Sequence, residues 1–130
     1  MTQKYELFRL RIGTEIVGYM KVHANGLKDF SNDQFWWTST PIEYTTKDQH
    51  CGLRDKNNRS LFEFDVVAMR RSVGPKNKTP GIIRFDPDRQ SFLFISLETC
   101  QEYELFANEL PLFHKSELTF IGFSFDNDQN

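Results

Sequence analysis

Short extended runs separated by turn signals constrain the fold of this chain more than any other feature of its sequence. Phe8, Leu10 and Ile12 alternate with arginines, as in a strand with one solvated face. Further runs with strand character cover residues 16–22, 42–46, 66–69, 82–85, 91–95 and 118–125. Thirteen phenylalanines in 130 residues also favour strands and aromatic packing over helices.

One segment, residues 99–110, has the pattern of a helix. Its apolar side chains recur at helical spacing with glutamates between them, and they are Tyr103, Phe106, Ala107 and Leu110. Thr99 with Glu102 three residues later forms a capping signature, and Pro111 marks the end. Short strands at this spacing with one short helix predict a mainly β fold, either a small β-barrel or a rolled sheet.

The charge balance excludes a strongly basic or acidic protein, since the net charge is −2. Residues 47–89 nevertheless hold ten basic and six acidic residues, whereas residues from 95 onward hold seven acidic residues and one lysine. Two copies could attract one another through these regions, so a homo-oligomer is one prediction, and two solvated loop regions are the other interpretation. The N-terminal residues carry charges where a signal peptide needs an apolar core, and no apolar run could span a bilayer. We therefore expect no membrane segment and a cytoplasmic protein with free thiols.

No residue pattern indicates a metal, a cofactor or a catalytic centre. The histidines and the two cysteines form no C-x-x-C or H-x-x-x-H pair. His50 and Cys51 are adjacent, and neighbours in an extended strand point to opposite sides. Turn roles explain the carboxylate pair Glu63 and Asp65, and the loop from Gly74 lacks the spacing of a phosphate-binding loop. We expect no enzyme activity, no cofactor and no metal.

Two segments resemble the YopX protein family of phages and prophages. Residues 52–58 and 61–67, GLRDKNN and LFEFDVV, are similar to the family signature G-L-x-D-x-x-G-x-x-I-Y-E-G-D-I-V. Residues 118–127, LTFIGFSFDN, are similar to its closing pattern, and residues 81–85 and 5–9 match weaker ones. The resemblance implies a C-terminal SH3-like barrel preceded by smaller N-terminal strands. It implies a phage context but no assigned activity.

The sequence departs from the family signature at both of its inner glycines. Asn58 stands at the turn glycine, which is a mild change because asparagine accepts a positive φ. Phe64 stands at the glycine of E-G-D, where a positive φ would strain a phenylalanine.

The domain organisation that follows has a strand-rich segment with an aromatic loop at residues 1–46 and a YopX-like SH3-type barrel domain at residues 47–130. Asp65 precedes a β-branched run, and its carboxylate can accept backbone N–H groups across the turn. We assign it this structural role rather than a catalytic one. The predicted structural turn residues are Asp55, Asn57, Asn58 and Asp65.

Two sets of residues are candidate contact surfaces. Phe35, Trp36 and Trp37 form a concentrated aromatic segment, which is either an exposed anchor for a protein partner or part of a core. A basic set could contact an acidic partner or nucleic acid, and it comprises Arg70, Arg71, Lys76, Lys78 and Arg84. The sequence predicts a non-catalytic phage or prophage accessory protein that binds a host or phage macromolecule in the bacterial cytosol, including inhibition of a host or defence protein. The alternative is a nucleic-acid-binding regulator that uses the basic residues between Arg70 and Arg84.

Overall fold

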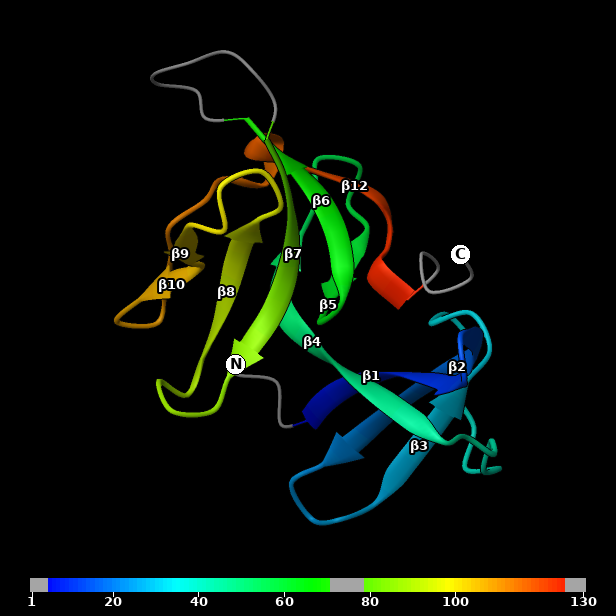
Figure 1. The fold of residues 1–130 in the computed structure, drawn as a ribbon. Helices are drawn as coiled ribbons and strands as arrows, with labels where there is room; N and C mark the ends of the chain where they lie inside the picture. Colours follow the sequence, from blue (N-terminus) through cyan, green and yellow to red (C-terminus); the bar gives the residue numbers. More distant parts are fainter. Residues whose placement is uncertain (1–4, 71–78, 126–130) are drawn as a thin grey trace. The chain divides into compact units, whose positions relative to one another are not determined.

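A computed structural model describes residues 5–70 and 79–125 of the chain (Figure 1). The chain divides into two compact units, Met1–His50 and Cys51–Asn130. The predicted boundary between residues 46 and 47 falls at the start of strand β4, Thr46–Arg54, which runs from the first unit into the second. The mainly β fold is confirmed, although the strands of the described residues form open antiparallel sheets rather than a closed barrel.

The first unit contains an antiparallel sheet in the order β3-β2-β1-β4. Its other strands are β1 (Tyr5–Ile12), β2 (Glu15–His23) and β3 (Lys28–Ser31). In β1 the predicted apolar face is buried, since Phe8 and Leu10 pack with Met20 and Phe30 in the core of this unit. The predicted strand over residues 42–46 is wrong for residues 42–45, which form no strand. Instead, Ile42 packs against this core, and the N–H of Thr45 donates to the carbonyl of Arg11 at the sheet edge.

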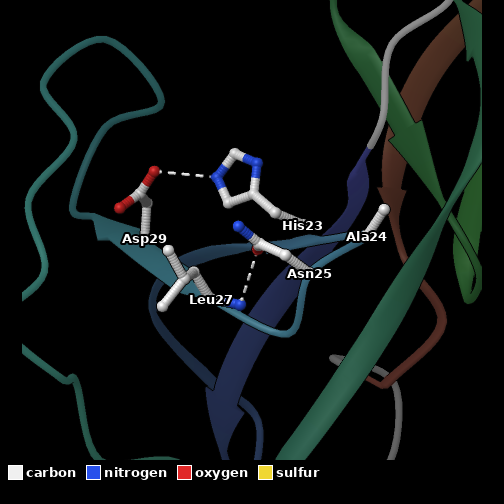
Figure 2. Close-up of a pocket in the computed structure, with 5 residues that line it drawn as sticks. All are labelled: His23, Ala24, Asn25, Leu27 and Asp29. Carbon is white, nitrogen blue, oxygen red and sulfur yellow. Dashed lines mark hydrogen bonds and ion pairs between the residues drawn. The ribbon is translucent and has the colours of Figure 1, made fainter.

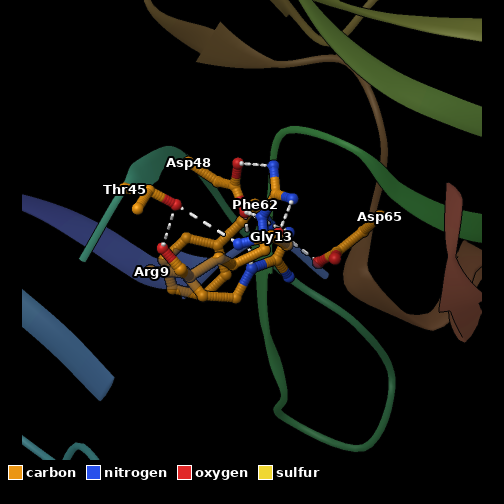
Figure 3. Close-up of polar contacts among 7 residues, drawn as sticks. Arg9, Gly13, Thr45, Asp48, Phe62 and Asp65 are labelled. Atoms are coloured by element: carbon orange, nitrogen blue, oxygen red, sulfur yellow. Dashed lines mark hydrogen bonds and ion pairs between the residues drawn. The ribbon is translucent and has the colours of Figure 1, made fainter. Parts of the chain in front are cut away.

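The prediction that the arginine face of β1 is solvated is wrong. Arg9 is 2% exposed and Arg11 is also buried, and both contact the fully buried Asp48 of β4. Arg9 Nε lies 2.9 Å from Asp48 Oδ2 (Figure 3). Arg11 Nε lies 2.8 Å from the same oxygen, and Arg11 Nη2 lies 2.8 Å from Asp48 Oδ1. The carboxylate favours the burial of the arginines because it offsets one of the two positive charges and accepts direct hydrogen bonds from both guanidinium groups.

The second unit contains a five-stranded sheet in the order β12-β6-β7-β8-β9. Its strands are β6 (Asp65–Met69), β7 (Thr79–Asp86), β8 (Ser91–Ser96), β9 (Glu102–Glu104) and β12 (Leu118–Phe123). The remaining short elements are β5 (Ser60–Phe62), β10 (Phe106–Ala107), β11 (Leu110–Pro111) and a 3₁₀ turn, η1 (Lys115–Glu117). The core includes Leu61, Val67, Ile83, Phe94 and Leu118. A Cβ at Gly81 would lie 2.3 Å from the Phe94 ring, so only glycine fits there.

The predicted helix over residues 99–110 is wrong. Residues 102–104 pair with β8, and Leu105, which lies off the predicted helical face, is fully buried. Cys100, Asn108 and Glu109 have positive φ angles, which a right-handed helix does not admit. In the part of the chain that the structure describes, no helix has the length and apolar character that crossing a membrane requires.

Two buried carboxylates hold the turns on either side of β5. Asp55 Oδ1 accepts the backbone N–H groups of Asn57 and Arg59, and its Oδ2 accepts that of Phe120, all at 2.9 Å. Asn58 occupies the positive-φ corner of this turn at 67°. Asp65 Oδ2 accepts the N–H of Phe62 at 2.8 Å (Figure 3). The four predicted turn residues therefore lie in or at the end of the turns that precede β5 and β6 and shape their backbone. They are Asp55, Asn57, Asn58 and Asp65.

Candidate protein-interaction site

The most exposed aromatic side chains of the described residues lie in the loop after β3. Phe35 is 87% exposed and Trp36 is 78% exposed. We call residues 32–37 the aromatic loop. Large exposed aromatic side chains are the groups that most often anchor protein interfaces, because their burial removes much apolar surface from water. The structure thus favours the exposed interpretation of this segment over the core interpretation.

The aromatic loop leaves the sheet from a fixed base. Phe30 is buried in the core of the first unit. Its N–H donates to the carbonyl of Thr38 at 2.7 Å, and the N–H of Thr38 donates back to Phe30 at 2.9 Å. This two-way bridge closes the loop on itself, so that residues between them form a defined projection from β3.

Ser31 and Asp33 hold the backbone of the aromatic loop. The Ser31 hydroxyl accepts the N–H of Gln34 at 2.8 Å and that of Asp33 at 3.2 Å, and it donates to Asp33 Oδ1 at 3.0 Å. Asp33 Oδ1 also accepts the N–H groups of Phe35 at 2.8 Å and of Trp36 at 3.1 Å. These hydrogen bonds lower the pKa of Asp33, with the largest effect from Phe35, followed by Trp36 and Ser31. The carboxylate is therefore ionised at neutral pH.

Trp37 supports the loop from inside and does not project with its neighbours. It is partly buried, and its indole Nε1 donates to the carbonyl of Gln34 at 3.1 Å. The Lys21 ammonium lies 4.3 Å from the Trp37 ring centroid, a cation–π distance. The three predicted interface residues therefore divide into two that face solvent and one that packs beneath them.

A groove of about 230 Å³ runs beside the aromatic loop. Trp36 and Asp33 line it together with Thr38, Pro41 and Ile42. Ile42 also packs against the core, so this wall is fixed to the sheet. The groove thus combines apolar walls, an indole and an ionised carboxylate.

The structure describes two of the five basic candidates. Arg84 is exposed, but its Nε lies 3.3 Å from Glu63 Oε2, which offsets its charge. Arg70 is exposed at the end of β6. The remaining three, Arg71, Lys76 and Lys78, lie outside the described residues. Of the predicted basic surface, the structure therefore describes only Arg70 and Arg84, and the charge of Arg84 is partly offset by Glu63.

A second cavity of about 410 Å³ lies at the turn between β2 and β3 (Figure 2). In this cavity His23 Nε2 lies 2.9 Å from Asp29 Oδ2, and the exposed Leu27 forms part of the lining. Sequence reasoning missed the His23–Asp29 pair, because only the pairing of β2 with β3 brings the two side chains together. The described residues that line this cavity include no serine, threonine or cysteine.

The remaining reactive side chains are dispersed. Cys51 is buried, which raises the pKa of its thiol to about 12, and Cys100 is exposed in a turn of the second unit. Within residues 5–70 and 79–125, no three histidine, cysteine, aspartate or glutamate side chains converge as metal ligands would. The aromatic loop is thus the feature of the described residues with the clearest chemical preference for a partner.

Comparisons of this chain with protein-family models, with curated proteins and with solved structures gave no match.

Proposed function

We propose that this protein is a non-catalytic binding module that attaches to a protein partner through the aromatic loop. The single observation that supports this most is the exposure of Phe35 and Trp36 on a backbone held by Ser31 and Asp33. A loop that is already ordered loses less conformational freedom when it binds, so more of the burial energy becomes affinity. Phe35 and Trp36 are the anchors, and Trp37 keeps their backbone in place.

The biological setting we propose is that of a phage or prophage accessory protein in the bacterial cytosol. Its support is the resemblance of residues 52–67 and 118–127 to the YopX family. The backbone adds to this support, since Asn58 and Phe64 occupy the two inner glycine positions of the signature and have φ angles of 67° and 76°. Those are angles that glycine adopts most readily. A host protein, including a defence protein, is the partner that suits a small binding module of this kind.

The test is capture of a partner from host lysate, followed by binding measurements with the purified pair. The variant Phe35→Ala/Trp36→Ala should weaken binding at least thirtyfold, about 2 kcal/mol, which is typical of interface anchors. Leu110→Ala is the matched control, because Leu110 is 68% exposed but lies in the second unit. It should leave the affinity unchanged.

Nuclease treatment and salt separate this proposal from the nucleic-acid alternative. Protein binding through the aromatic loop should survive nuclease and depend weakly on salt. Binding that is lost on nuclease treatment, and that falls log-linearly with salt, would instead support the basic residues as the contact surface. Equal capture by the double variant and the wild type would refute the proposal.

A further inference from the structure

The groove beside the aromatic loop has the chemistry to recognise a particular kind of side chain. Its walls include the apolar Pro41 and Ile42, and Trp36 presents an indole that is 78% exposed. Among the described residues that line it, Asp33 carries the only charge. An elongated side chain with an apolar stem and a positive head group would match all three features.

The carboxylate of Asp33 is held in position and still has acceptor capacity. The bonds that described residues make to its side chain all reach Oδ1, from Ser31, Phe35 and Trp36. An ionised carboxylate has about four acceptor sites over its two oxygens, so Oδ2 can accept further donors. Because the same bonds fix the Trp36 backbone, the carboxylate lies at a fixed position next to the point from which the indole projects.

We propose that this groove binds an arginine side chain of the partner, with the guanidinium between the Trp36 ring and Asp33 and the aliphatic stem along Pro41 and Ile42. This inference rests on the proposed function, because it names the partner chemistry of the same loop. Arginine fits better than lysine, since its planar guanidinium stacks on an indole while donating to a carboxylate. A cation–π contact and an exposed ion pair are each weak alone, and together they correspond to about a tenfold gain in affinity.

The test is an NMR titration of the full ¹⁵N-labelled chain with N-acetyl-arginine amide. N-acetyl-citrulline amide is the matched control ligand, because it has nearly the same shape but no charge. We expect saturable shifts of the Trp36 indole N–H and of the backbone amides of residues 33–38, with about tenfold weaker binding of the citrulline compound. Equal affinities for the two compounds, shifts centred elsewhere, or no saturable shift would overturn the inference.

Two variants separate the charge from the loop structure. Asp33→Asn keeps an Oδ1 acceptor for the N–H groups of Phe35 and Trp36 but removes the charge. It should weaken binding of the arginine compound about threefold, which is the share of the ion pair, and leave binding of the citrulline compound unchanged. Trp36→Leu keeps apolar surface and removes the ring face, so it should reduce the preference for arginine over citrulline to the roughly threefold share of the Asp33 ion pair. Slow hydrogen exchange of the Phe35 and Trp36 amides in Asp33→Asn verifies that the loop is intact.

The inference and the proposed function fail in different ways. If Phe35→Ala/Trp36→Ala abolishes partner capture while the groove does not prefer the arginine compound, the function stands and the arginine assignment is overturned. If the groove prefers the arginine compound but the double variant captures the partner normally, the groove chemistry stands and the proposed function fails.

Discussion

Replacing Phe64 by glycine and, separately, by alanine tests the backbone strain in the turn between β5 and β6. Phe64 has a φ of 76°, and its N–H donates to the carbonyl of Ile83 at 2.7 Å while its own carbonyl accepts the N–H of Ser124 at 2.9 Å. These two bonds, one to β7 and one to the residue directly after β12, hold Phe64 in the left-handed region. We predict that the glycine variant is more stable than the alanine variant.

The magnitude follows from two opposing contributions to the free energy of unfolding. The left-handed region costs a residue with a Cβ about 1–2 kcal/mol, and glycine has no such cost. Glycine loses about 0.5–1 kcal/mol relative to alanine, because it has more backbone freedom in the unfolded chain. Both variants lose the Phe64 ring and its contact with the Arg84 guanidinium at 4.7 Å, so that loss cancels. Glycine should therefore win by about 0.5–1 kcal/mol.

Urea unfolding of both variants, followed by tryptophan fluorescence and circular dichroism, measures this difference through the midpoint at constant m-value. The same pair of substitutions at Glu104 is the control, because this exposed residue lies in strand β9 and has no positive φ. There the order should be reversed, with alanine more stable by about 0.5–1 kcal/mol. An alanine variant at position 64 that equals or exceeds the glycine variant would refute the strain argument.

Two further predictions concern buried ionisable groups. Asp48→Asn leaves the buried Arg9 and Arg11 without their carboxylate, and urea unfolding should show a loss of about 3–5 kcal/mol. Asp86→Asn, at the partly exposed pair with Arg89, should cost less than about 1 kcal/mol, and a similar cost for both variants would contradict the buried cluster. Burial raises the pKa of Cys51 from 9.0 to about 12, so above pH 9 the unfolded thiol loses its proton before the folded one does. Its stabilising contribution is complete below pH 9 and decreases toward pH 12, by up to about 1.4 kcal/mol per pH unit, so wild type should lose stability faster than Cys51→Ala over that range.

Local patterns in the sequence predicted six of the twelve strands of the described residues, which are β1, β2, β6, β7, β8 and β12, and several of the turns that join strands. Asp55 and Asn58 illustrate why, because the bonds from Asn57 and Arg59 to the Asp55 carboxylate span two and four residues and depend on local turn chemistry. The bond from Phe120 to the same carboxylate joins residues 65 positions apart, and no local pattern could reveal it. Turn residues were therefore accessible from the sequence, whereas their contact with strand β12 was not.

The errors arose where a distant partner decides between two local patterns. Residues 102–105 fit a strand as well as a helix, and pairing with the open edge of β8 selects the strand. Arg9 and Arg11 alternate with apolar residues as a solvated face would. Their burial depends on hydrogen bonds to the carboxylate of Asp48, which lies 39 and 37 residues away in the sequence. Neither partner can be assigned from the segment itself.

The aromatic loop shows where a local signal existed but was not used. Ser31 and Asp33 are residues whose side chains commonly bond to backbone N–H groups two or three positions ahead, and such bonds turn a chain away from a strand. That signature, directly before Phe35 and Trp36, indicates a projecting turn rather than a continuation into the core. Composition alone left both alternatives open, because aromatic residues are common in cores and in interfaces.

The exposure of Phe35 and Trp36 is a property of the folded loop and not of a frayed segment. Five hydrogen bonds from or to Ser31 and Asp33, together with the bridge between Phe30 and Thr38, fix the backbone on which they stand. If burial of apolar side chains alone stabilised this loop, Phe35 and Trp36 would pack inward, as Trp37 does. Instead, the backbone bonds stabilise the loop without the burial of the two rings, so their apolar surface remains available for a partner and little reorganisation opposes binding.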